Sequence, residues 1–197
     1  TTNGGDSWTK VSANDEIHNV TALAQDPRDG HQNKWYYGTG ELSGNSASLG
    51  AFYNGNGVWK STDSGVTWTK ITNINDSEFT VFDVYADMIN ALEVNPVSGE
   101  LFIATYQKLY SFDGTNLTPE KDGPSGWTDV VIASNGSVFA SFQGDGVWTS
   151  PTGNGSWVQI SPSSKTDWAP TGRIVLAEAP SNTNVIYALY VNGEEGI

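Results

Sequence analysis

Short apolar runs that end in turn-forming residues recur along the chain in pairs. The two clearest pairs are 22–27 with 35–39 and 91–96 with 101–105. Two weaker pairs follow, at 131–136 with 138–141 and at 176–180 with 185–189. The runs are rich in aliphatic and aromatic residues and are bounded by Gly, Pro, Asn and Asp, which is typical of short strands joined by turns. Each pair therefore predicts two antiparallel strands.

A second pattern, two strands around a tight turn, follows some of these pairs. It is clearest at 57–71 and has a weaker copy at 146–160. Residues 1–11 match the end of such a hairpin, and 196–197 match the start of one. In the repeat between the two copies, the run at 108–114 replaces the usual third strand and turn. The sequence is thus expected to begin and end inside a repeat.

A complete repeat contains four strands, which is the composition of a β-propeller blade. The predicted fold class is therefore all-β, a β-propeller of four-stranded antiparallel blades, with residues 1–197 forming part of a single domain. The expected units are the end of a blade, three blades and an incomplete blade, at 1–11, 18–71, 88–121, 127–160 and 172–197. Closing a propeller usually takes more complete blades, so an open fragment is expected. A parallel β-helix is the competing repeat fold, but its rungs are shorter and lack such hairpins.

The overall charge narrows the range of partners. Nine basic residues against 22 acidic ones give a net charge of −13, which disfavours nucleic acid and anionic lipid surfaces. The absence of cysteine excludes disulfides and thiolate metal sites, and His18 and His31 lack metal-ligand spacing. No run approaches the ~18 apolar residues of a membrane span. The sequence therefore predicts no cofactor, no metal site, no nucleic-acid partner and no membrane span.

A Ser-x-Asp-x-Gly-x-Thr-Trp motif occupies the clearest tight turn. Its residues are Ser61, Asp63, Gly65, Thr67 and Trp68. Degenerate copies at 1–8 and 150–157 keep part of the pattern, with the structural residues Asn3, Gly5, Trp8 and Trp157. The motif resembles the Asp-box, or bacterial neuraminidase, repeat of sialidases, sortilin-like receptors and xyloglucanase-like glycosidases. The resemblance covers essentially the whole chain and implies a secreted propeller protein.

The motif residues indicate a structural role. The Asp63 carboxylate can accept hydrogen bonds from backbone N–H groups of the turn, Gly65 tolerates a positive φ, and Trp68 covers the hairpin with apolar surface. The degenerate copies have Asn3 or Thr152 at the Asp63 position. A catalytic carboxylate would tolerate such replacement poorly, so the motif predicts a fold and no chemistry.

Candidate binding residues lie on loops at the face opposite the motif turns. In propellers, the turns between second and third strands and the links between blades share that face. Aromatic rings stack on the C–H surfaces of sugars, and carboxylates accept hydrogen bonds from sugar hydroxyls. The candidates are Glu41, Tyr53, Asp83, Tyr85, Asp87, Asp145, Asp167 and Trp168. The alternative for each of them is a plain surface position or packing between blades.

Catalysis would require side chains that the sequence supplies only in part. A sialidase-like site needs an arginine cluster, but the chain has only Arg28 and Arg173. A xyloglucanase-like hydrolase needs two carboxylates across a cleft. The segment 37–41 is similar in position to the Tyr-x-x-Thr-Asp context of that family, with Glu41 in place of Asp. No second carboxylate matches, so Glu41 is the one catalytic candidate and no complete catalytic site is predicted.

The leading functional prediction is a secreted or cell-surface bacterial module that binds glycan or protein, without catalysis in this segment. The resemblance to sortilin-like proteins implies export by the type IX secretion machinery of Bacteroidetes. It also implies that the segment docks against the rest of its own propeller. The alternative is a fragment of an Asp-box propeller glycoside hydrolase, a xyloglucanase-like endo-glucanase. A second carboxylate facing Glu41 in the intact protein would distinguish the hydrolase.

Overall fold

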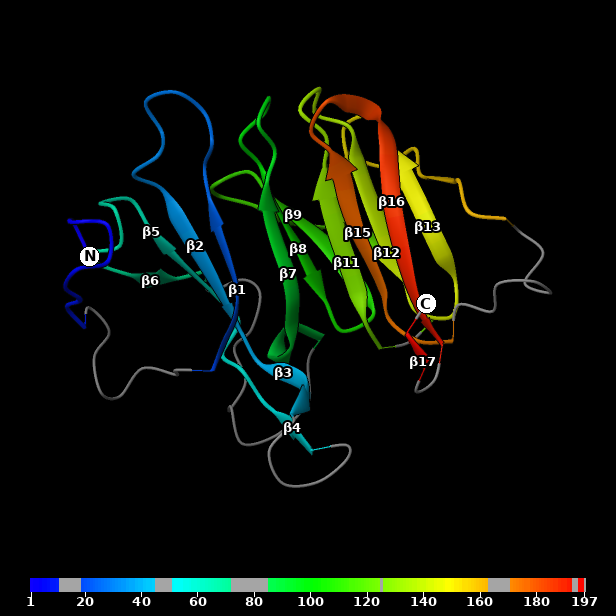
Figure 1. Ribbon diagram of the computed structural model, residues 1–197, viewed down its shortest axis with the longest axis horizontal. Helices are drawn as coiled ribbons and strands as arrows, with labels where there is room; N and C mark the ends of the chain where they lie inside the picture. Colours follow the sequence, from blue (N-terminus) through cyan, green and yellow to red (C-terminus); the bar gives the residue numbers. More distant parts are fainter. Residues whose placement is uncertain are drawn as a thin grey trace.

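The protein is an open row of antiparallel β-sheets. The computed structural model describes residues 1–10, 19–44, 51–71, 85–124, 126–162, 171–192 and 195–196. Within these ranges the regular structure consists of strands and one short 3-10 helix, η1 (Tyr85–Asp87). The strands form three four-stranded sheets and one three-stranded sheet. In Figure 1 the first sheet lies on the left and the second in the middle, and the third and fourth overlap on the right. They do not close into a ring, so the prediction of an open all-β propeller is confirmed.

The strands of each sheet follow one another in the chain. The first sheet contains β1 (Val20–Gln25), β2 (Trp35–Thr39), β5 (Val58–Ser61) and β6 (Thr69–Lys70). The second contains β7 (Ile89–Val94), β8 (Leu101–Thr105), β9 (Lys108–Phe112) and β10 (Leu117–Asp122). The third contains β11 (Thr128–Ile132), β12 (Val138–Phe142), β13 (Gly146–Ser150) and β14 (Val158–Gln159). The fourth contains β15 (Ile174–Ala179), β16 (Asn182–Asn192) and β17 (Glu195–Gly196). A separate hairpin of β3 (Glu41–Gly44) and β4 (Ala51–Tyr53) lies between β2 and β5 in the chain.

Each sheet is an antiparallel meander, as a propeller blade requires. In the first sheet β1 pairs with β2, β2 with β5 and β5 with β6, all antiparallel. This pairing excludes a parallel β-helix. The first strands of successive blades, β1, β7, β11 and β15, contact one another. They therefore form the inner edge of the blades, and the later strands lie farther out.

Apolar clusters between neighbouring blades hold the row together. Ile103 of β8 packs toward the first blade in a cluster with Val58 of β5. Its chain neighbour Phe102 packs toward the third blade in a cluster with Phe142 of β12. Successive side chains of a strand point to opposite faces, so β8 is buried on both sides, and all five of its residues are buried. This double burial explains why the run at 101–105 is continuously apolar.

Asp63 is the central acceptor of the turn between β5 and β6. Its Oδ1 accepts the backbone N–H of Thr67 at 2.9 Å and the hydroxyl of Ser61 at 2.8 Å. The indole N–H of Trp68 donates to the Gly65 carbonyl at 3.1 Å, and Gly65 has a φ of +84°. Hydrogen bonds from the Thr67 hydroxyl and backbone lower the pKa of Asp63 to about 2.

The degenerate turns differ in how far they keep these bonds. Asn3 Oδ1 accepts the backbone N–H four residues later at 3.1 Å, and the Trp8 indole donates to the Gly5 carbonyl at 3.0 Å. In the third copy the Ser150 hydroxyl donates to a backbone carbonyl at 2.6 Å, and Trp157 packs on the cluster between the second and third blades. An amide can therefore replace the carboxylate in this turn.

Asp63→Ala is expected to lower the melting temperature of the protein more than Asp63→Asn, because only Ala removes the acceptor. The folded-state pKa of Asp63, about 2, lies below its ordinary 3.8. The ionised carboxylate thus contributes stability that is present above about pH 4 and is lost as the pH falls toward about 2. Asp63→Asn should remove this dependence. Thermal unfolding at neutral and acidic pH tests both points, and equal melting temperatures for the Ala and Asn variants would contradict them.

Carboxylates from neighbouring blades cap the free edges of the inner strands, where an unpaired N–H would be costly. Asp129 of β11 accepts a backbone N–H of β15 at 2.9 Å. Glu93 of β7 accepts the backbone N–H of Ile132 in β11. Burial raises the pKa of Glu93 to about 7, and the negative charges of Asp129 and Glu178 add to the rise. Ionisation of Glu93 therefore costs more free energy in the folded protein than in the unfolded chain.

Glu93→Gln is expected to change how stability depends on pH. The folded-state pKa of Glu93, about 7, exceeds its ordinary 4.5, so the folded protein binds this proton more tightly than the unfolded chain. Relative to the variant, the wild type should lose up to about 3 kcal/mol of unfolding free energy as the pH rises from about 4.5 to about 7. Urea unfolding of both proteins across the window measures the difference. A difference that stays constant with pH would show that Glu93 ionises normally.

Candidate functional site

The two ends of the blades carry different loops. At one end, the turn between β1 and β2 meets the motif turn, where the Asn33 amide donates to the Thr62 carbonyl at 2.5 Å. At the other end, the loops after β2 meet the links between blades, where Gly55 donates its N–H to the Asp87 carbonyl at 2.7 Å. The second end is the face on which the sequence places the candidate binding residues.

A pocket of about 380 Å³ opens on this second face. We call it the axial pocket, and it is lined by Val20, Thr21, Gly40, Glu41, Leu42, Ile89, Asn90, Trp127 and Arg173. The first residues of β1 and β7 form part of the wall, and Trp127 and Arg173 immediately precede β11 and β15. All four blades therefore contribute to one pocket at the start of the inner strands. Its volume falls in the range of small-molecule sites, roughly 300–1,000 Å³.

Glu41 reaches the axial pocket because the backbone turns sharply at Gly40. Gly40 has a φ of +92°, and a Cβ at this position would lie 1.8 Å from the Asp87 carbonyl oxygen. Only glycine fits both the conformation and the close approach. Directly after it, β3 pairs with β4 so that Glu41 stands opposite Tyr53. The glycine and the hairpin together fix where the Glu41 side chain begins.

The axial pocket combines the side-chain types that recognise sugars. Trp127 is half-buried, and its backbone N–H donates to the Gln143 side chain at 3.1 Å. Asn90 is held by hydrogen bonds from its amide to the Thr105 carbonyl and the Thr128 hydroxyl, at 3.0 and 3.3 Å. An indole offers an apolar ring for stacking, and a carboxylate with a guanidinium offers hydrogen bonds to hydroxyls. Glu41 is the one carboxylate among the lining residues.

The other predicted binding residues do not line the axial pocket. Tyr53 and Tyr85 are partly exposed, and the Lys108 ammonium lies 4.9 Å from the centre of the Tyr85 ring. Asp87 is 0% exposed, so its carboxylate is not placed to contact a glycan. Asp145 accepts the Trp148 indole N–H at 2.8 Å, which ties it to the third blade. The remaining predictions, Asp83, Asp167 and Trp168, fall outside the described residues.

Of the residues that line the axial pocket, only Glu41 is among the predicted binding residues. The sequence predicts no binding role for Asn90, Trp127 or Arg173, although their side chains can stack on a sugar ring or form hydrogen bonds with it. Their common feature is position, because each stands within two residues of the start of an inner strand. That place in the repeat is the sequence signal by which they could have been found.

Two xyloglucanases share sequence similarity with this chain, although no known protein family model matches it. A xyloglucanase of a Paenibacillus species is 28% identical over 55% of this chain and 13% of its own length. A xyloglucanase of Acetivibrio thermocellus is 27% identical over 55% of this chain and 16% of its own length. The chain thus spans less than a fifth of the length of these relatives.

Solved structures share the fold at low sequence identity. A GH74 enzyme of Niastella koreensis has a TM-score of 0.54 and 19% identity, over 90% of this chain and 27% of that chain. An ancestral GH74 enzyme has a TM-score of 0.53 and 15% identity, over 87% of this chain and 22% of that chain. These likenesses support the fold.

Proposed function

We propose that this chain is part of a propeller glycoside hydrolase that acts on a xyloglucan-like β-glucan, and that the axial pocket binds sugar units of that polymer. The position of Glu41 in a sugar-sized pocket supports the proposal, together with the similarity to xyloglucanases. The sequence favoured a non-catalytic binding module, and these relatives favour its alternative instead. A polymeric substrate of this kind would be met outside the cell.

Each lining residue has a distinct role in this proposal. Glycoside hydrolysis uses one carboxyl group to donate a proton to the leaving oxygen and a second to act as base or nucleophile. Glu41 supplies one of the two. Trp127 stacks on a sugar ring, and Arg173 and Asn90 hold hydroxyl groups by hydrogen bonds. The second carboxylate must come from another segment, because Glu41 is the one carboxylate among the described residues that line the axial pocket.

Assays of polymer cleavage and retention test the proposed function. The protein should release reducing ends from xyloglucan, and more slowly from an unbranched β-glucan. A binding module would instead be retained on xyloglucan without cleaving it. Retention without any new reducing ends, under conditions where a known xyloglucanase is active, would restore the binding-module interpretation. A protein that is not retained on xyloglucan and does not cleave it would contradict both the hydrolase and the binding-module interpretation.

A further inference from the structure

A second concave site lies between the outer strands of the first and second blades. This interblade groove has a volume of about 390 Å³. It is lined by Lys60, Thr62, Thr67, Thr69, Lys70, Ile71, Phe112, Gly114 and Thr115. Its lining runs along β5 and β6 from Thr62 and Thr67 of the motif turn to Ile71, whereas the axial pocket lies at the start of the inner strands. No residue is shared between the lining of the groove and that of the axial pocket.

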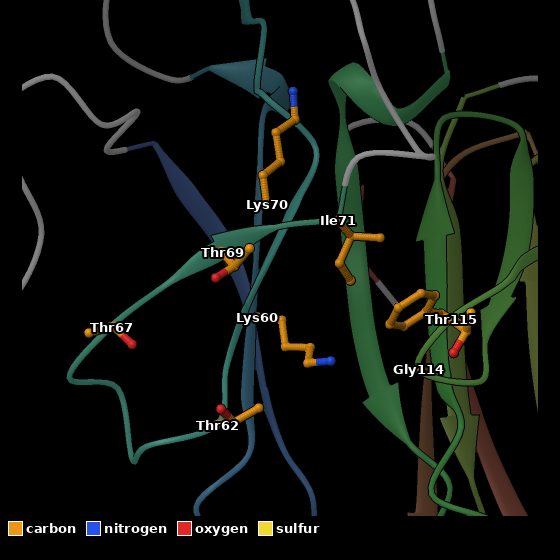
Figure 2. A pocket seen from close by; sticks show the side chains of 9 residues that line it. Lys60, Thr62, Thr67, Thr69, Lys70, Ile71, Gly114 and Thr115 are labelled. Atoms are coloured by element: carbon orange, nitrogen blue, oxygen red, sulfur yellow. The ribbon is translucent and has the colours of Figure 1, made fainter.

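Lys60 gives the groove a positive charge that the rest of the lining does not neutralise. The chain carries 22 acidic residues, but none of the described residues that line the groove is acidic. Lys60 forms no ion pair with a described residue, and its ammonium lies 5.9 Å from the centre of the Phe112 ring. Figure 2 shows Lys60 extending from β5 toward Gly114 and Thr115 of the second blade, whereas Lys70 points away. Lys60 is therefore the cation presented to a ligand.

The equivalent groove between the second and third blades has the opposite charge. Its lining includes Glu100, Asp113 and Glu120, with no basic residue. There Glu120 accepts the Gly155 N–H at 3.0 Å and the Ser111 hydroxyl at 2.7 Å, so its carboxylate helps dock the blades. Among the described residues of the first groove, no carboxylate has this role. A positive groove is thus a property of this particular pair of blades.

Hydroxyl groups surround Lys60. Thr62, Thr69 and Thr115 are exposed, and their hydroxyls make no hydrogen bond to a described residue, whereas the Thr67 hydroxyl donates to Asp63. Such hydroxyls can donate to and accept from a polyhydroxylated ligand. The groove is also of small-molecule size, roughly 300–1,000 Å³. A ligand that fits this lining carries an anionic group and several hydroxyls on one compact ring.

We propose that the interblade groove binds a carboxylate-bearing sugar unit, a uronate, with Lys60 holding the carboxylate and the threonines holding hydroxyls. The site does not depend on the axial pocket or on catalysis by Glu41. A free inorganic anion shares the charge of a uronate but lacks its hydroxyls, and a neutral sugar shares the hydroxyls but lacks the charge. These two compounds therefore separate the contributions of Lys60 and the threonines.

Calorimetric titration with a glucuronate disaccharide, the matching neutral disaccharide and sulfate tests the proposal. The uronate should bind at least about tenfold more tightly than either other compound, and more weakly as salt is added. Lys60→Gln should weaken uronate binding at least about tenfold, while Lys60→Arg should retain most of it. Lys34→Gln, which removes a lysine outside the groove, should have no effect. Melting temperatures of the variants identify any that fail to fold.

A double variant, Thr62→Val with Thr115→Val, completes the test. It should weaken binding of the uronate and leave binding of sulfate unchanged. Sulfate binding as tight as that of the uronate would show a general anion site and overturn the proposal. Unchanged uronate affinity in folded Lys60→Gln, or equal affinity for the neutral disaccharide, would overturn it as well.

Discussion

Glu41→Gln is expected to reduce the turnover of xyloglucan at least about a hundredfold, with little change in substrate binding. Gln has nearly the same shape as Glu and can still form hydrogen bonds, but it cannot donate or accept the catalytic proton. The axial pocket contains no other carboxylate among its lining residues that could substitute. Reducing-end release at saturating substrate gives the turnover, and retention on xyloglucan gives the binding.

Glu100→Gln is the matched control for this substitution. Glu100 lies in the turn between β7 and β8, where it bonds to the Ser98 hydroxyl at 3.1 Å, and it does not line the axial pocket. Its loss should leave turnover within about twofold of the wild type. Trp127→Ala should mainly raise KM, because it removes a stacking surface and no proton-transfer group. Turnover retained by Glu41→Gln would show that Glu41 is not catalytic.

Phe102→Ala is expected to cost about 3–5 kcal/mol of unfolding free energy. Phe102 is 0% exposed and belongs to the cluster that joins the second and third blades. Its ring lies directly against the backbone of the third blade, because a Cβ at Gly153 would lie 2.2 Å from it. The third blade therefore has little room to close the cavity, and the loss should lie at the upper end of the range.

Urea unfolding of the wild type and the Phe102 variant measures this cost. Val97→Ala is the control, since Val97 is 63% exposed and its truncation should change stability by less than about 0.5 kcal/mol. A loss below about 1 kcal/mol for Phe102→Ala would show that the blades are not joined by this cluster in solution.

The strands of the blades were predictable because their signals are local. Apolar runs and turn residues indicated strands near 22–27 and 101–105, and the structure has β1 (Val20–Gln25) and β8 (Leu101–Thr105) there. The atypical run at 108–114 forms a regular strand, β9 (Lys108–Phe112), although it lacks the motif turn. Leu109 and Ser111 are buried on one face of this strand, so its side chains pack in the blade as those of the other third strands do.

The axial pocket was less predictable because it depends on contacts between blades. Trp127 and Arg173 are 46 residues apart in the sequence, and only the docking of inner strands brings them into one lining. Contacts within the folded protein also decide which carboxylates remain free to contact a ligand. Asp87 is wholly buried, which the residues next to it in sequence do not reveal, whereas Asp145 is held by a local contact with Trp148, three residues later.

A structure of the protein in complex with a xyloglucan oligosaccharide would show directly whether the axial pocket binds the substrate. Sugar units are expected in the axial pocket, with Trp127 against a ring face and Glu41 within hydrogen-bond distance of a glycosidic oxygen. Oligosaccharide found only in the interblade groove, or an empty axial pocket at a saturating oligosaccharide concentration, would contradict this expectation.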